Sequence, residues 1–164
     1  MNTGQMMMTM GAMVLFSTIM LRVNTSSLLN ESVRDQAQYG VLATSIATSI
    51  IEEATSKSFD EKTDSNSVSD VKELTIVSNL GPDAGETYAT FNDFDDFNGF
   101  TRRDSTMPSA IFDISCEVMY VESNKINQKS SSPRWHKKIN ITVSSPFTPD
   151  TFRTSSIFSY WYFR

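Results

Sequence analysis

The chain has 164 residues, a length that favours a single domain, and 39% of them are hydrophobic, which is enough to form a core. Its 14 basic and 19 acidic residues give a net charge of −5, which argues against a nucleic-acid partner because phosphate contacts need a basic surface. One cysteine and one histidine exclude an intramolecular disulfide, a cysteine-rich zinc site and a histidine metal cluster. The sequence also lacks a phosphate-binding loop and a Gly-x-Ser-x-Gly motif, so we expect neither an enzyme nor a small-molecule substrate.

Residues 1–21 are the most informative segment because they contain no charged side chain. In a helix that rises about 1.5 Å per residue, this segment approaches the ~30 Å thickness of a bilayer's hydrocarbon core. Four structures fit it: a cleaved secretory signal, a single-span anchor, a buried helix of a soluble domain, and a helix that inserts into the membrane first and packs among copies of itself later. The lack of a basic residue before Arg22 argues against the signal. We favour the last structure, whose subunit-packing residues are Met6, Met7, Met10, Met13, Leu15, Phe16, Ile19 and Leu21.

The next segment continues this helix with a single apolar face. From Leu28 to Ala54, apolar residues recur mostly at spacings of three and four, which is typical of an amphipathic helix, and the first proline is Pro82. The sequence predicts one helix from about residue 5 to about residue 57, with a bend or loosened turn near residues 22–27, where weak helix formers occur. A helix of this length is too long to be buried in its own domain, so its first half is expected to lie in lipid or among other subunits.

The rest of the chain is expected to form a polar loop and then an antiparallel sheet. Residues 58–71 are polar and acidic, as in a loop, and residues 73–77 are a short candidate strand. Alternating apolar and polar residues predict strands at 110–121 and 135–143. A last strand is expected in residues 156–164, which are aromatic on both faces and must therefore be central in the sheet or covered by a neighbour.

This order of elements predicts an α+β fold, in which the apolar face of one long N-terminal helix lies on a small antiparallel sheet. The predicted contacts between the layers join Val41, Leu42, Ile46 and Ile50 of the helix to Phe112, Ile114, Val118, Ile139, Ile141 and Val143 of the strands. We expect an apolar membrane or filament-core helix at 1–25 and a globular domain at 26–164. The domain comprises an amphipathic helix at 26–57, an acidic loop at 58–71 and the sheet at 72–164.

An uncharged helix that continues into an amphipathic half and then a sheet resembles the type IV pilin and pseudopilin superfamily. Gly4 follows a short polar leader, and prepilin peptidase sites in this family have a glycine at that boundary, which makes Gly4 and Gln5 the processing candidates. The stretch Asp93–Phe100 is similar to an Asp-Asp-aromatic-Asn-Gly stretch in minor pilins of the mannose-sensitive haemagglutinin type. The chain departs from the family at Thr9, where the family usually has a glutamate.

The resemblance implies a structural subunit that polymerises through its apolar helix into an extracellular filament or a secretion pseudopilus. Its partners would be copies of itself or related pilins, and it would lie in the bacterial cytoplasmic membrane before assembly. The alternative function is a single-span membrane-anchored module that recognises a partner through its β-domain. A polymer should need the apolar helix to assemble, whereas a monomeric module should not.

The acidic stretch at residues 93–100 supports two interpretations. Its oxygen atoms could bind calcium, a cation that prefers several oxygen ligands, although the spacing differs from that of an EF-hand loop. Alternatively, the phenylalanines that recur at every third residue from Phe91 to Phe100 fix a loop to the sheet while the acids face water. The calcium candidates are Asp93, Asp95, Asp96 and Asn98, and no other cofactor is expected.

Basic residues gather in the segment between the predicted strands 110–121 and 135–143 and at the start of the latter. They are interpreted either as a solvated patch or as a contact with the acidic region of another subunit. The patch consists of Lys125, Lys129, Arg134, His136, Lys137 and Lys138.

Overall fold

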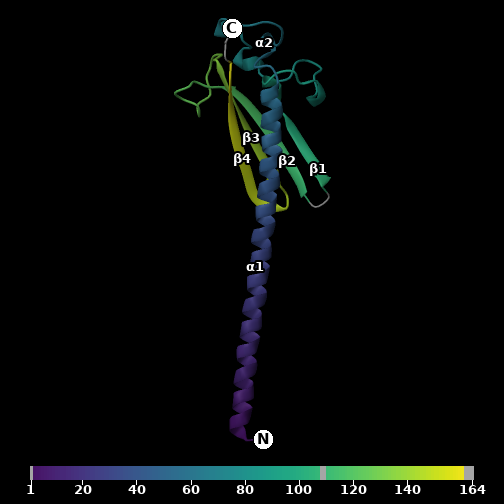
Figure 1. Cartoon of the computed structure of the whole chain (residues 1–164), viewed down its shortest axis with the longest axis vertical. Coiled ribbons are helices and arrows are strands. Elements are labelled where there is room, and N and C mark those ends of the chain that lie inside the picture. Colours follow the sequence, from purple (N-terminus) through teal and green to yellow (C-terminus); the bar gives the residue numbers. More distant parts are fainter. Residues whose placement is uncertain (1, 108–109, 161–164) are drawn as a thin grey trace. The chain divides into compact units, whose positions relative to one another are not determined.

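A computed structural model describes residues 2–107 and 110–160 of the chain (Figure 1). One long helix is followed by a short helix, single-turn 3₁₀ segments and a four-stranded antiparallel sheet, so the predicted α+β class is confirmed. The helices are α1 Thr3–Ser56 and α2 Glu61–Ser65, and the strands are β1 Thr101–Met107, β2 Ala110–Tyr120, β3 His136–Ser145 and β4 Thr148–Ser159.

The chain divides into two compact units, Met1–Tyr39 and Gly40–Arg164, and α1 contributes residues to both. The predicted helix matches α1 to within two residues at each end. Helical structure is continuous through residues 22–27, so the loosened turn expected there is wrong. Thr25 is a weak helix former, but its Oγ1 donates to Leu21 O at 2.9 Å. This hydrogen bond satisfies the hydroxyl group within the helix, so the helix continues through Thr25.

The first unit is a helical segment whose apolar side chains are exposed. The exposed fraction is 78% for Met7 and 71% for Met13. Hydroxyl groups of this segment are paired within the helix, since Thr9 Oγ1 donates to Met6 O at 2.9 Å. By length and composition, α1 is able to cross a membrane.

In the second unit, α1 packs on the sheet (Figure 1), and its buried residues are mostly alanines. The buried residues recur at spacings of four, three and four, which places them on one face of the helix. Gly40 lies against Phe152 of β4, where an added Cβ would come within 3.2 Å of the aromatic ring. A larger side chain at Gly40 would therefore have to displace this ring. The buried stripe of α1 consists of Ala43, Ala47, Ile50 and Ala54.

This stripe differs from the predicted one. Ile50 is buried as expected, but Leu42 and Ile46 are only half-buried, and Val41 is 70% exposed. The sequence prediction selected the largest apolar side chains, whereas three of the four residues that α1 buries are alanines.

Replacing Ala47 with leucine should lower the free energy of unfolding by about 1–3 kcal/mol, because the larger side chain enters a closely packed layer. The nearby Ser49 is exposed and offers a matched control, since Ser49→Leu introduces the same side chain outside the layer. Urea unfolding of the full chain in detergent, followed by circular dichroism, measures both changes. Equal effects of the two substitutions would contradict the position of Ala47.

The sheet is an antiparallel meander in the order β1-β2-β3-β4. The strands predicted at 110–121 and 135–143 are confirmed as β2 and β3, and their register pairs Val118 with Ile139 on the buried face. Lys137 belongs to the same buried face, two residues before Ile139. The alternating pattern therefore predicted correctly which side chains of these strands point inward.

The rest of the sheet differs from the expectation in three respects. Residues 73–77 form no strand and lie in a segment of 3₁₀ turns. β1 was not predicted, because its sequence is polar throughout and does not alternate. The strand expected at 156–164 is present as the end of β4, which begins at Thr148. β4 is an edge strand of the described sheet, so of the two expected positions, central in the sheet or covered by a neighbour, the central one is excluded. Residues 161–164 lie outside the described part of the chain.

Candidate functional site

The acidic stretch folds into a compact turn that its aromatic side chains fix in place. Phe91, Phe94 and Phe97 are buried, and the ring centroids of Phe91 and Phe97 are 5.3 Å apart. The Phe94 ring also contacts Phe158 of β4, with centroids 5.2 Å apart. The prediction that the phenylalanines fix this loop to the sheet is confirmed.

The acidic side chains of this turn are buried, and the prediction that they face water is wrong. Asp93, Asp95 and Asp96 are at most 3% exposed. Asp93 Oδ1 accepts hydrogen bonds from the N–H groups of Asp95 (2.7 Å) and Asp96 (3.1 Å). Asp96 Oδ2 accepts from the N–H groups of Asn92 (2.9 Å) and Asp93 (3.1 Å). A single 3₁₀ turn leaves several backbone N–H groups without a carbonyl acceptor. The carboxylates of Asp93 and Asp96 accept hydrogen bonds from these N–H groups, and they therefore point inward.

Asn98 connects the turn to β2. Its Nδ2 donates to Leu80 O at 2.8 Å, and its Oδ1 accepts from the N–H of Val118 at 2.9 Å. Gly99 follows with a φ of 78°, a left-handed conformation that glycine adopts without strain. The N–H of Gly99 then donates to Cys116 O at 3.0 Å, so the chain is already paired with β2 where β1 begins.

These contacts bear on the four predicted calcium ligands. The side-chain oxygen of Asn98 is used by β2, away from the three carboxylates. Among the residues that the structure describes, no group of three or more His, Cys, Asp or Glu side chains is arranged to hold a metal ion. Calcium binding stays a hypothesis. The three aspartates line a cavity of about 260 Å³ together with Glu61, Lys62, Leu74, Thr75, Ile76, Asn79, Gly81 and Asp83.

The ammonium group of Lys137 is buried beside this turn. Lys137 Nζ donates to Phe59 O at 2.7 Å and to Asp60 Oδ2 at 2.9 Å, and it also forms an ion pair with Asp95. The alternation of β3 placed Lys137 on the inner face, so its burial had a signal in the sequence. Its partners had none, because Asp60 lies 77 residues away and was expected in a solvated loop.

Asp60 is the centre of the polar contacts in this core. It caps the first turn of α2 and accepts from the N–H of Lys62 at 3.1 Å. Its carboxylate also accepts from Thr75 Oγ1 and from Tyr120 Oη, both at 2.9 Å. An aspartate that caps a short helix is a recognisable sequence signal, but its contacts with β2 and β3 depend on tertiary structure.

The electrostatics of this cluster are unbalanced, since four buried aspartates surround one ammonium group. Burial opposes ionisation of Asp60, but the Lys137 charge and the hydrogen-bond donors lower its pKa below the ordinary value. Burial and the charges of Asp95 and Asp96 raise the pKa of Asp93 to about 9. Burial also raises the pKa of Asp95 despite its contact with Lys137. The cluster therefore retains a proton at neutral pH.

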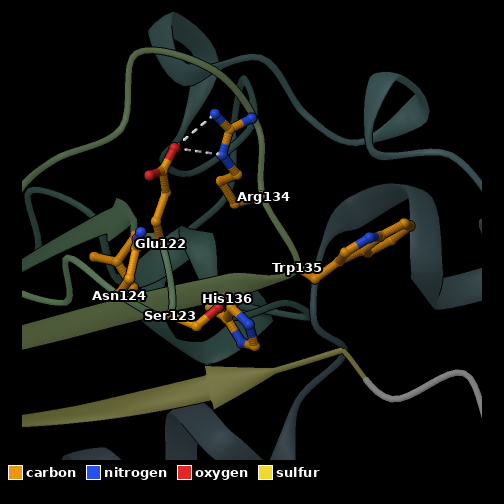
Figure 2. A pocket seen from close by; sticks show the side chains of 7 residues that line it. Glu122, Ser123, Asn124, Arg134, Trp135 and His136 are labelled. Atoms are coloured by element: carbon orange, nitrogen blue, oxygen red, sulfur yellow. Dashed lines mark hydrogen bonds and ion pairs between the residues drawn. The ribbon is translucent and has the colours of Figure 1, made fainter.

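A second cavity, of about 560 Å³, lies between the end of β2 and the start of β3 (Figure 2). Glu122 and Arg134 are paired on its wall, where Arg134 donates two hydrogen bonds to Glu122 Oε1, at 2.8 and 3.1 Å. Figure 2 shows that Trp135 points away from this ion pair. The lining residues are Val121, Glu122, Ser123, Asn124, Arg134, Trp135 and His136.

The predicted basic patch is not a single surface. Lys137 is buried on the inner face of β3, whereas Lys138 points outward and donates to Asn127 Oδ1 at 2.9 Å. Arg134 is paired with Glu122. The prediction is wrong because successive residues of a strand point to opposite faces and cannot share one surface.

The predicted processing and packing residues lie in the first unit. Gly4 and Gln5 are exposed in the first turn of α1. The packing candidates are also exposed, and their contacts with other subunits stay predictions. They are Met6, Met7, Met10, Met13, Leu15, Phe16, Ile19 and Leu21.

Comparisons with known protein families, with characterised proteins and with solved structures give no significant match. The resemblance to pilins therefore depends on the sequence pattern and on the class of fold.

Proposed function

We propose that the chain is a structural, pilin-like subunit that polymerises through its apolar N-terminal helix into an extracellular filament or a secretion pseudopilus. The first part of α1 carries this proposal, because a charge-free sequence presents exposed apolar side chains there, among them Met7, Met13 and Leu21. Contiguous apolar surface gains free energy by leaving water, and a soluble monomer rarely exposes much of it. Lipid and neighbouring helices are the environments that would cover it.

The proposed assembly uses both environments in turn. The subunit first lies in the bacterial cytoplasmic membrane, and α1 then exchanges lipid for contacts with copies of itself or with related pilins. Such contacts are mainly van der Waals contacts, and flexible methionines such as Met6 and Met10 fill gaps between helices. Thr9 and Thr18 are compatible with both environments because their hydroxyls donate to carbonyls of the same helix.

The contacts that set the register between subunits would be unusual for a pilin. Residues 1–21 contain no carboxylate that could pair with the amine of a neighbouring subunit. Thr9 stands where the family usually has a glutamate, and its hydroxyl already donates to Met6 O at 2.9 Å. Register would therefore depend on the shapes of the side chains rather than on a buried ion pair.

Phe16→Ala should reduce the yield of filaments, because removing a large side chain from a tightly packed bundle costs about 3–5 kcal/mol per subunit. Ile76→Ala is a suitable control, since Ile76 is exposed in a loop of the second unit. Negative-stain images of filaments sheared from cells provide the yield, and membrane fractionation shows whether unassembled subunits remain anchored. Equal yields from the two variants, or a wild-type chain that never forms filaments, would exclude the polymer.

The processing step is tested separately by sequencing the N-terminus of the purified chain. Gln5 as the first residue is expected if a prepilin peptidase acts after Gly4. An intact Met1 would exclude such processing, and polymerisation would then have to be shown by imaging alone.

A membrane-anchored binding module is the second candidate function, and the cavity at the start of β3 favours it. The ion pair of Glu122 with Arg134 and the ring of His136 offer donors and acceptors on the wall of this cavity. In this case the chain should remain monomeric in detergent and in membranes, and Phe16→Ala should leave its partner binding unchanged.

A further inference from the structure

Lys137 and Asp95 meet in a position that permits a covalent bond between them. Lys137 Nζ contacts Asp95 Oδ1, and the exposed fractions of the two side chains are 0% and 3%. The residues are 42 positions apart, and β3 holds one while the turn Asp95–Phe97 holds the other. An amine held against a buried carboxyl group is arranged for amide formation, because the fold supplies the encounter that free reactants lack.

Two neighbouring aspartates provide the proton transfers that this reaction needs. Asp60 Oδ2 lies 2.9 Å from Lys137 Nζ, and the lowered pKa of Asp60 keeps it ionised as a proton acceptor. Asp93 lies beside Asp95, since its Oδ1 accepts from the N–H of Asp95 at 2.7 Å, and its pKa of about 9 keeps it protonated at neutral pH. A nucleophile, an electrophile, an acceptor and a donor of protons thus occupy one buried cluster.

We propose that Lys137 and Asp95 react to form an intramolecular isopeptide bond, an amide between Lys137 Nζ and Asp95 Cγ that joins β3 to the acidic turn. The reaction takes place within one folded chain, so it is independent of whether the chain polymerises.

The step is a dehydration in which atoms and charges balance. A proton moves from the Lys137 ammonium to the Asp95 carboxylate, which gives a neutral amine and a neutral carboxylic acid. The Nζ lone pair attacks Asp95 Cγ, while Asp93 donates a hydrogen bond to the carbonyl oxygen and stabilises its developing negative charge. Asp60 accepts the second Nζ proton and returns it to the departing hydroxyl group. The Cγ–O bond breaks, one water molecule leaves, and Asp60 and Asp93 return to their starting states without any oxidant.

Asp95 is the reacting acid, and Asp60 is not. The carboxylate of Asp60 accepts hydrogen bonds from Lys62, Thr75 and Tyr120 in addition to Lys137, and these donors stabilise its ionised form. An ionised carboxylate is a poor electrophile. Burial raises the pKa of Asp95, so the neutral acid that an amine can attack is more accessible there.

The surroundings favour the product. Lys137 Nζ lies 4.7 Å from the centroid of the Phe59 ring and 5.2 Å from that of Tyr120. These rings help to exclude water, which is both the leaving product and the reactant for hydrolysis. The amide also replaces a buried ion pair by a neutral group, which removes the cost of keeping two charges away from water.

Mass spectrometry of the full chain tests the proposal directly. The chain, purified in detergent and denatured, should be lighter than its sequence requires by one water molecule, and Lys137→Arg, which lacks the amine, should retain that water. Trypsin should release a branched peptide that joins Glu73–Arg102 to Trp135–Lys138, because a linked Lys137 is not cleaved. A chain that keeps the water overturns the proposal. A branch from Ser58–Lys62, which contains Asp60, overturns the assignment of Asp95.

Three conservative variants test the chemistry. Asp95→Asn should give a linked product of the same mass as the wild type, because its amide loses ammonia in place of water. Asp93→Asn keeps the size of the side chain but has no acidic proton, so linking should slow by about 10²-fold. Asp113→Asn is the control, since the side chain of Asp113 is 50% exposed on β2, and its linking rate should equal that of the wild type. Unchanged linking in Asp93→Asn would refute the role of Asp93 as proton donor.

Discussion

Replacing Asp60 with alanine should lower the free energy of unfolding of the chain that lacks the Lys137–Asp95 amide by about 3–5 kcal/mol, because it removes one partner from a buried group of charges. The Asp60 carboxylate accepts a hydrogen bond from Lys137 Nζ at 2.9 Å and one from the N–H of Thr75 at 3.1 Å. Without it, a buried ammonium and a buried backbone donor each lose an acceptor that water cannot replace. Urea unfolding of the full chain in detergent, followed by tryptophan fluorescence, measures the loss.

Two further variants show whether the effect belongs to the buried cluster. Asp60→Asn keeps the size of the side chain but not its charge, so it should have an intermediate effect. Asp113→Ala removes an exposed carboxylate whose ion pair with Arg103 has a long N–O distance of 3.7 Å, and it should change stability by less than about 1 kcal/mol. A loss for Asp60→Ala no larger than that for Asp113→Ala would show that the cluster does not stabilise the fold.

The folded chain should lose stability as the pH rises from about 5 to about 8.5, by up to roughly 1.4 kcal/mol per pH unit for one retained proton. Folding raises the pKa of Asp93 from an ordinary 3.8 to about 9, through burial first and then the charges of Asp95 and Asp96. Over this range the folded chain holds a proton that the unfolded chain has released. The resulting stabilisation is complete below pH 3.8 and is lost as the pH approaches 9. Urea unfolding at a series of pH values gives the slope.

Asp93→Asn provides the control for this pH dependence, because asparagine resembles the protonated acid and does not titrate. Compared with the wild type before the Lys137–Asp95 amide forms, the variant should show a much flatter profile and should be more stable at the alkaline end. Asp60 acts in the opposite direction, since its lowered pKa makes its contribution disappear only in more acidic solution. Wild-type stability that rises over the same range would contradict the assignment. The titratable and charged groups around Asp93 are Asp60, Glu61, Lys62, Asp83, Glu86, Asp95, Asp96 and Lys137.

The helices and strands whose apolar residues recur at a regular spacing could be predicted from the sequence. α1 and the strands β2 and β3 follow their spacing of apolar residues closely, because each buries one face against the other layer. β1 could not be found in this way, since its residues are polar and its position depends on pairing with β2. The buried stripe of α1 was also misjudged, because the distance between helix and sheet decides whether alanine or a larger residue fits.

The candidate site was harder to predict than the fold. The sequence pointed to the acidic stretch, but it placed Asp93, Asp95 and Asp96 in water, where isolated carboxylates usually lie. Their burial depends on backbone donors of their own turn and on Lys137, which is distant in sequence. Asp60 had no visible link to this group at all. Contacts between polar residues that are far apart in the chain produce no periodic pattern in the sequence. These residues can be recognised as neighbours only from the tertiary structure.

The asparagine–glycine pair at the entrance to β1 has a consequence for how the protein ages. Such pairs deamidate when the glycine nitrogen attacks the asparagine side chain through a cyclic imide. In the folded chain, the Gly99 nitrogen donates to Cys116 O, and both ends of the Asn98 amide are engaged with Leu80 and Val118. Attack therefore requires this turn to open. The rate at which isoaspartate forms at Asn98 should thus report how often this part of the sheet opens.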